Sequence, residues 1–498
     1  MDEVATVNLL GGSLGDLLPD IRDSESTPPL YYLLAFAWTK LFGTSEVAIR
    51  SLSALIGTAT VPLAFATARR LVEERAALVA AGLVAVNPIL VWYSQEARAY
   101  ALLVLLTVVS LGAFAVACRR PSVTPTRAHP SGRTHPGTPI RAQAGRQASR
   151  RGALVLWALA SALALTTHYF AIFVILPEAL WLLAAARRRG AAAPGETDRR
   201  AVAAVAGVVA VGVALIPLAL RQRSHEGASF IADLDFGARL VQLPKQYLIG
   251  FDGPFEAPAA IAAAGLALFG AVLLFTRASA DERRGARIPA VVAIIGLLVP
   301  LVLAAAGADY VITRNMLAAL VPLLIVLAAG FGACAAGRIG IAGAAALCAL
   351  SVALVVAVPL DARYQRSDWR AIAEALGPAP ASRAIVVSPA SDTAALEHYL
   401  GPSRRLGSTG FPYREVWVVG LASQSSGTSR NPHPPGVSPG LDHLGLDPAG
   451  RRLEETFAVY RLRGDRETRY SRDALDAIAI APGASEILLQ RQGTPAGE

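Results

Sequence analysis

The chain has 498 residues, of which 54% are hydrophobic and only 17% are charged, and its formal net charge at pH 7 is +9. Apolar runs of roughly bilayer-spanning length recur along it, which excludes a soluble globular protein and indicates a polytopic membrane protein. Nearly all of the positive charge is arginine in loops, and we expect no nucleic-acid partner. The three cysteines stand in apolar stretches, which argues against a disulfide framework or a cysteine metal site.

The chain opens with MDEVATVNLL, so that Asp2 and Glu3 precede any apolar segment. Residues 27–43 (TPPLYYLLAFAWTKLFG) begin with two prolines that fix an extended backbone, and the apolar run after them is too short for a span. We predict a helix lying in the membrane interface, with Tyr31, Tyr32 and Trp38 in the aromatic belt.

Ten apolar segments then predict a bundle of transmembrane helices. Arginines cluster in every second connecting loop, and the positive-inside rule makes those loops cytoplasmic. Residues 1–45, the other loops and everything after 359 are then extracytoplasmic, in a plasma-membrane protein. The predicted spans are 46–69, 76–93, 97–118, 152–167, 170–186, 201–220, 257–276, 288–306, 315–336 and 340–358.

This topology places Asp2 and Glu3 outside with no helix to carry them across. We expect one more span ahead of Met1, which would make eleven and put the true N-terminus in the cytoplasm.

Residues 119–151 are rich in Arg, Pro, Thr and Gly without an apolar period, and they predict a disordered cytoplasmic loop on anionic lipid headgroups. His129 and His135 lie in this loop without a cysteine or carboxylate beside them, which argues against a metal site.

After residue 360 the pattern changes to alternating short helices and strands. Helices are predicted at 366–376 and 393–400 and strands at 384–390, 414–420 and 456–463, with a flexible loop near 421–447. We therefore predict a transmembrane catalytic domain at 1–360, an extracytoplasmic α/β domain at 361–465 and an unassigned tail at 466–498.

Several ionisable residues fall at the outer ends of predicted spans. Glu96 and Arg98 stand in YSQEARAY, which fits either a site or a solvated loop. Arg314 in ITRNM fits a binding residue, a loop charge or a partner of Asp309. His168 in TTHYFA fits a metal or substrate contact or a cap at the interface.

The succession of DE, PPLYYLLAFAWTKLFG, YSQEARAY, THYFA, DYVITRNM and SDWRAIAEAL resembles the GT-C glycosyltransferases over about residues 1–420. It is most similar to the bacterial branch related to protein O-mannosyltransferases and lipid A aminoarabinose transferase. The resemblance implies inverting transfer of a hexose such as mannose from a polyprenyl-phosphate carrier to an extracytoplasmic protein, glycan or lipid. Many relatives carry His before the proline pair, where this chain has Thr27.

The resemblance also implies roles for particular residues. Asp2 matches the first residue of the family's acidic pair and is the expected catalytic base. Glu3 and Glu96 would orient the acceptor or hold a divalent cation, with His168 as a further metal candidate; no cofactor is otherwise expected. The residues expected to bind the donor are Arg98 and Arg314, which would grip its phosphate, together with Tyr93, Gln95, His168 and Tyr169.

A rival from another class is a transporter or flippase of lipid-linked sugars, with ionisable residues lining a pathway. A transporter favours charges near the midplane and on broken helices. This chain keeps nearly all of its intramembrane ionisable residues at the predicted outer boundary, which favours the enzyme. Transfer to lipid A or another envelope lipid is a further alternative.

Overall fold

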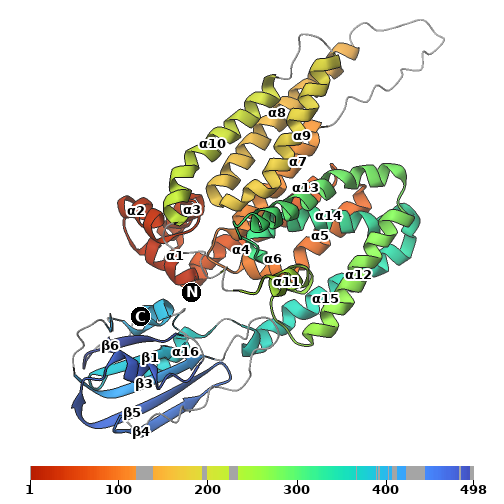
Figure 1. Ribbon diagram of the computed structural model, residues 1–498. Helices are drawn as coiled ribbons and strands as arrows, with labels where there is room; N and C mark the ends of the chain where they lie inside the picture. The colour runs from red at the N-terminus through yellow and green to blue at the C-terminus, as the bar shows by residue number, and fades with distance from the viewer. Residues whose placement is uncertain are drawn as a thin grey trace, which may run out of the picture. The chain divides into compact units, whose positions relative to one another are not determined.

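The computed structural model divides into two compact units, one of Thr6–Val355 and the other of Val356–Glu498 with the first five residues (Figure 1). The described residues are 2–118, 138–192, 199–223, 231, 234–365, 367–388, 390, 393–401, 403–406, 412–421, 444–481 and 484–493.

The first unit is a helical bundle. Within its described residues, eight helical segments are long and apolar enough to cross a membrane, or nine if one bent pair counts as a span. This confirms the predicted polytopic helical fold. The segments contain α4 (Glu46–Ala68), α7 (Tyr100–Cys118), α9 (Ile172–Ala192), α10 (Arg199–Arg223), α12 (Glu256–Thr276), α13 (Ala280–Ala305), η3 (Thr313–Ala319) with α14 (Leu320–Phe331), and α15 (Gly337–Ala357). Helix α8 (Thr138–Thr167) contains the remaining predicted span.

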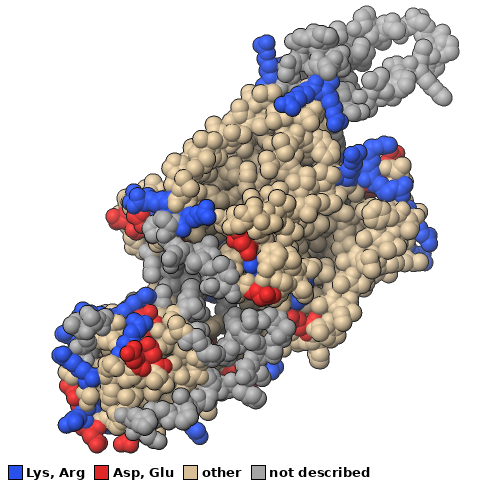
Figure 2. All heavy atoms as spheres, in the orientation of Figure 1, with Lys and Arg blue, Asp and Glu red and all other residues tan. Residues whose placement is uncertain are grey.

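Two of these segments form the centre of the bundle. The most apolar window of α7 is 72% buried and that of Thr313–Phe331 is 78% buried, against 17% for α10. Helix α10 instead exposes large apolar side chains such as Val209, Val213 and Leu220, as a lipid-facing helix does. On the visible face of this unit, charged side chains gather at helix ends, and the surface between them is almost free of charge (Figure 2).

The predicted span 76–93 is broken into α5 (Glu74–Val86) and α6 (Pro88–Ser94), which meet at a bend of 56°. Pro88 cannot donate a backbone hydrogen bond, and the Asn87 side chain accepts from the Leu90 N–H at 3.2 Å, so a new helix starts there. The Asn87 amide also donates to the Tyr247 carbonyl at 2.8 Å, on α11 (Phe236–Ile249). After the break, α6 leads directly into the turn that contains Glu96 and Arg98.

Before the first span lie α1 (Asp2–Gly11), α2 (Leu14–Ser24) and α3 (Leu30–Phe42). Helix α3 is the predicted short helix, but the prediction of a belt position is wrong for Tyr31 and Tyr32, because both rings are fully buried. The Tyr31 hydroxyl bonds the Ser53 hydroxyl at 2.9 Å, so its polar end is satisfied inside the protein.

The prediction of a loop over 119–151 is also corrected. Residues 138–151 are the first turns of α8, whereas 119–137, with His129 and His135, lie outside the described residues. Pro139 stands in the first turn, where no backbone N–H is needed, and the alanines, arginines and glutamines after it are good helix formers.

The second unit contains a six-stranded sheet in the order β2-β6-β1-β3-β5-β4. Strands β1 and β3 are parallel, with Ile385 opposite Trp417, and the other neighbours are antiparallel. The strands are β1 (Arg383–Ser388), β2 (Arg404–Arg405), β3 (Tyr413–Leu421), β4 (Leu446–Leu453), β5 (Phe457–Thr468) and β6 (Glu486–Gln490).

Both faces of this sheet are covered. Helices α16 (Trp369–Leu376) and α17 (Thr393–Leu400) pack on one face, and the segment that contains α18 (Arg472–Asp476) packs on the other. The three predicted strands and two predicted helices of this domain are all present. Its sheet extends past residue 465, however, because β6 comes from the unassigned tail and pairs with β1. Most of the predicted flexible loop, 422–443, lies outside the described residues.

Candidate active site

An ion pair joins two non-helical segments at one end of the bundle. Arg98 lies in the turn between α6 and α7, where its N–H donates to the Glu96 carbonyl at 2.8 Å. Its guanidinium Nη1 donates to Oε1 of Glu25 at 2.8 Å, and the two side chains are only 9% and 3% exposed. Glu25 follows α2 directly, so this pair fixes the start of the α2–α3 connection against the α6–α7 turn.

Burial makes this pair costly to disturb. Two charges removed from water lose much of their hydration, and their mutual attraction offsets that loss only while both are present. Removing one partner of such a pair typically destabilises a protein by about 3–5 kcal/mol. Sequence reasoning missed Glu25, because DSESTPP looks like an ordinary acidic loop; the informative sign was a carboxylate three residues before the proline pair.

The α2–α3 connection is held by neutral hydrogen bonds as well. Thr27, at the position where many relatives carry His, bonds the Tyr32 hydroxyl at 3.2 Å. From α10, the Gln222 amide donates to the carbonyls of Ile21 at 3.0 Å and Thr27 at 3.2 Å. Its oxygen accepts from the Tyr169 hydroxyl at 2.7 Å. Gln222, also missed from the sequence, therefore ties Tyr169 to the acidic connection, and Figure 1 shows α2 and α3 beside the end of α10.

His168 lies between α8 and the short helix η1 (Tyr169–Ala171), and it is 3% exposed. Its Nδ1 accepts the Phe170 N–H at 3.3 Å, so in the neutral ring Nε2 carries the proton. Burial, followed by the positive charges of Arg314 and Arg98, lowers the pKa of His168 to about 3. The imidazole is therefore a neutral hydrogen-bond donor among cationic side chains.

The other residues of YSQEARAY divide into buried and exposed ones. Tyr93 packs on Tyr100 and Phe251 with ring centroids 4.5 Å and 5.9 Å away. Glu96 is 9% exposed, and its Oε1 accepts the Trp92 indole N–H at 3.2 Å. Gln95 ends α6 and is exposed. The turn thus holds a second buried carboxylate two residues from Arg98.

Arg314 stands in η3, whose start follows a separate ion pair. Arg239 grips Asp309 through two bonds of 3.0 Å and 2.6 Å and also donates to the Val311 carbonyl at 2.8 Å. Arg314 lies near enough to His168 for its positive charge to contribute to the lowered pKa of that ring.

The structure thus brings Arg98, Arg314 and His168 together and links Tyr169 to them through Gln222. Asp2 and Glu3 begin α1, but their side chains lie outside the described residues. Among the described side chains there is no group of three or more His, Cys, Asp or Glu residues that could hold a metal ion.

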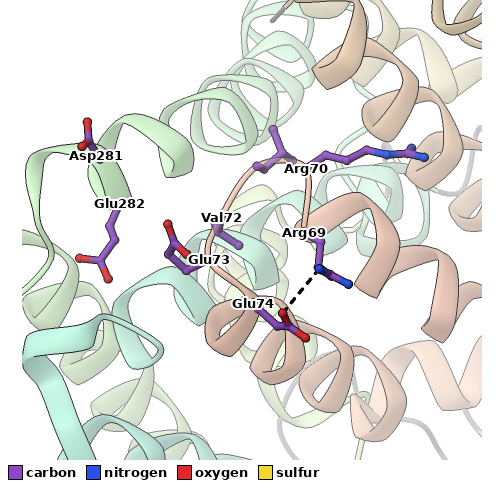
Figure 3. Close-up of a pocket in the computed structure, with 8 residues that line it drawn as sticks. Arg69, Arg70, Val72, Glu73, Glu74, Asp281 and Glu282 are labelled. Carbon is purple, nitrogen blue, oxygen red and sulfur yellow. Dashed lines mark ion pairs between the residues drawn. The ribbon is translucent and has the colours of Figure 1, made fainter. Parts of the chain in front are cut away.

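A polar cavity of about 360 Å³ lies elsewhere in the helical unit, between the α4–α5 loop and the start of α13 (Figure 3). Arg69 pairs with Glu74 there at 3.5 Å. The Glu282 carboxylate accepts from the backbone N–H groups of Ser279 at 2.7 Å and Cys334 at 2.8 Å. Glu282 forms a capping box with Ser279. The predicted site residues do not line this cavity, which is separated from Arg98 by the length of α5 and α6.

Residues 26–124 match the family model of dolichyl-phosphate-mannose-protein mannosyltransferase. No curated protein matches the chain significantly. Among solved structures, the chain is similar to ArnT from Cupriavidus metallidurans in the apo state, at 17% identity and a TM-score of 0.44, over 75% of this chain and 64% of that one.

The ArnT structure bound to undecaprenyl phosphate matches at 18% identity and a TM-score of 0.41, over 70% of this chain and 59% of that one. The archaeal oligosaccharyltransferase AglB from Archaeoglobus fulgidus, in complex with an inhibitory peptide and a dolichol-phosphate, matches at 15% identity and a TM-score of 0.38, over 70% of this chain and 49% of that one. The chain spans less than two thirds of the length of each.

The segment that matches the family model contains both PPLYYLL and YSQEARAY, the blocks on which the sequence resemblance rests most. It also contains the buried residues Tyr32, Glu96 and Arg98. The match confirms that resemblance, and the chain fits a member of the GT-C superfamily of membrane glycosyltransferases.

Proposed function

We propose that this chain is an inverting glycosyltransferase that moves a hexose, mannose, from a polyprenyl-phosphate carrier to an extracytoplasmic acceptor. The observation that carries the proposal is the cluster of Arg98 and His168, which are buried, and Arg314, which is half-buried, at one end of a membrane bundle. The family match over the segment that holds Arg98 supports the reaction class and the sugar.

The position of the cluster suits a lipid-linked donor. A polyprenyl chain stays in the hydrocarbon, so its phosphosugar lies at the boundary, where the helix ends are. We propose that this end lies outside the cell, which the alternation of arginine-rich loops supports, and that the C-terminal α/β unit is extracytoplasmic as well. In this arrangement the helical unit carries Glu96, Arg98, His168 and Arg314.

The transfer needs a base and a way to stabilise the leaving phosphate. The acceptor hydroxyl attacks the anomeric carbon, its proton passes to a carboxylate, and the bond from that carbon to the phosphate oxygen breaks. By the resemblance Asp2 is the base, worth about a hundred- to ten-thousandfold in rate. Arg98 and Arg314 neutralise the charge that develops on the departing polyprenyl phosphate. Glu96, with Glu3, orients the acceptor.

His168 has a distinct role in this proposal. As a neutral ring with a proton on Nε2, it donates a hydrogen bond to a phosphate oxygen without adding a third positive charge. Tyr93, Gln95 and Tyr169 line the donor path beside it. The acceptor is a secreted protein hydroxyl, a cell-envelope glycan or a lipid.

The test uses membranes that contain the full-length protein and radiolabelled polyprenyl-phosphate sugars, mannose among them. We expect label to leave the lipid fraction and enter an acceptor, and Arg98→Ala membranes with equal protein content to transfer far less. Failure to transfer label from any such donor would overturn the proposal.

A second candidate, a transporter or flippase of lipid-linked sugars, has one observation in its favour. Glu178 lies within the α9 span and is 1% exposed. Ionisable residues at such depth often mark transport pathways. Its Oε2, however, accepts from the Ser110 hydroxyl at 2.5 Å and the Trp157 indole at 2.8 Å, which ties three helices together. This arrangement favours a packing role, so the transferase remains our proposal.

A further inference from the structure

Glu25 binds the guanidinium of Arg98, the same group that binds the donor phosphate in the proposed function. Carboxylate and phosphate oxygens are equivalent acceptors for an arginine, and both bind it through charge-assisted hydrogen bonds. Oε1 of Glu25 sits at 2.8 Å from Nη1 of Arg98, the distance that a phosphate oxygen would also adopt.

The two partners are held in different ways. The Arg98 guanidinium lies over the Tyr32 ring at 6.0 Å from its centroid, and the Tyr32 hydroxyl is itself bonded to Thr27. The Arg98 guanidinium thus has a contact besides Glu25, in a tyrosine that is held by Thr27 and also interacts with Glu25. Glu25 instead follows the last residue of α2 with an extended backbone (φ −104°, ψ 160°), at the start of a non-helical connection. Displacement of Glu25 from Arg98 therefore requires rotation of its side chain only.

We propose that Glu25 holds the place of the donor phosphate on Arg98 and is displaced when the phosphate binds. This inference rests on the proposed function. Exchange of one anion for another keeps the buried guanidinium neutralised in both states, which avoids the cost of an isolated buried charge. Return of the carboxylate then competes with the product, polyprenyl phosphate, and helps to release it. Glu25 is thus a positioning residue that lowers phosphate affinity in favour of turnover.

The experiment measures equilibrium binding of undecaprenyl phosphate to the purified full-length protein in lipid nanodiscs. Four proteins are compared: wild type, Glu25→Gln, Arg98→Ala and the double variant. We expect Glu25→Gln to bind about tenfold more tightly, a change of about 1.4 kcal/mol, because a neutral amide competes poorly for the guanidinium. Arg98→Ala should bind at least tenfold more weakly, and the double variant should resemble Arg98→Ala.

Asp23 provides a matched control two residues away. It is 43% exposed and pairs with Arg22 and Arg221, so Asp23→Asn should leave phosphate affinity within twofold of wild type. Undecaprenol, which lacks the phosphate, should bind all variants equally. If Glu25→Gln does not fold, Glu25→Asp takes its place, because its shorter reach weakens the pair, and it should tighten phosphate binding to an intermediate extent.

The outcomes separate the inference from the proposed function. Equal or weaker binding by Glu25→Gln or Glu25→Asp, with Arg98→Ala still impaired, would make the pair purely structural and overturn the inference alone. Absence of phosphate-dependent binding by wild type, together with absence of label transfer, would overturn the proposed function.

Discussion

Of the three glutamates that are buried among the described residues of the helical unit, Glu25 and Glu178 differ most clearly in what surrounds them. Glu25, at the end of the bundle, has a side chain that is 3% exposed and meets a guanidinium. Glu178, within the α9 span, is 1% exposed and meets a serine hydroxyl and an indole. Burial is nearly the same for both, but one carboxyl is paired with a cation and the other with neutral donors.

The contrast indicates where this protein could bind an anionic ligand. An anion binds where a cation is already desolvated and held in place, as Arg98 is by Tyr32. Around Glu178 the hydrogen bonds instead hold α7, α8 and α9 together, an arrangement that stabilises helix packing in a membrane. We therefore expect substitutions at the cluster to change donor binding and transfer, and substitutions at Glu178 to change neither.

The largest effect is expected from Asp2, the proposed catalytic base. Asp2→Asn should lower turnover by about a hundredfold or more with donor binding retained, because it removes proton acceptance with little change of shape. Single-turnover label transfer beside donor binding measures both quantities. Near-normal turnover would remove Asp2 from the mechanism and make Glu96 the next carboxylate to test as the base.

The next effect is expected at Arg98. Arg98→Ala should reduce transfer by at least about tenfold, and Arg98→Lys should restore only part of it, because an ammonium lacks the planar pair of donors. Initial rates at saturating donor would measure the loss of turnover, and rates at limiting donor would show the additional loss of donor binding. Full rescue by lysine would mean that any positive charge suffices there.

A smaller effect with a pH signature is expected at His168. Its pKa is lowered from 6.5 to about 3, so the unfolded chain binds a proton below about pH 6.5 that the folded protein takes up only near pH 3. Stability should therefore fall as the pH decreases through this window, and His168→Gln should remove that part of the fall. Thermal unfolding between pH 4 and 8 measures it; an unchanged pH dependence would contradict a buried neutral ring.

His168→Gln should also retain more transfer than His168→Ala, because the glutamine amide can replace the Nε2 donor. The pH profile of transfer by wild type should show no step near 6.5 from this residue. If wild type does show a step near pH 6.5, and both variants lack it, His168 titrates during turnover and the expectation is wrong.

The smallest effect is expected from Glu178→Gln, the same substitution that is proposed for Glu25. The amide keeps an oxygen that accepts from Ser110 and Trp157, so transfer and donor affinity should stay within about twofold. A large loss of transfer, with normal expression, would erase the contrast between the two glutamates and favour the transporter candidate.

Sequence reasoning found the features that depend on local pattern. Spans such as α7 and α10, and strands such as β1 and β3, follow from apolar runs whose length suits a bilayer or a buried sheet. Arg98 and His168 were found because polar residues stood at the ends of such runs. Their convergence was implied only by the family resemblance.

Features that depend on distant partners were missed. Glu25 and Gln222 acquire their roles from Arg98 and Tyr169, which are far away in the chain. Strand β6 was left in the tail because a five-residue segment with only three apolar residues shows its identity only when it pairs with β1. Tyr31 and Tyr32 looked like belt residues because no local pattern distinguishes an interfacial ring from one buried beneath neighbouring helices.

The central claim, that the donor phosphate binds at the Arg98 cluster, is tested most directly by photo-crosslinking. A polyprenyl phosphate analogue with its photoreactive group beside the phosphate would be bound to the full-length protein, and the labelled peptides would be identified by mass spectrometry. We expect label within 25–32, 95–100, 168–170 and 313–316, reduced by excess undecaprenyl phosphate and by Arg98→Ala. Label concentrated instead around Ser110, Trp157 and Glu178 would contradict the account and place the phosphate within the spans.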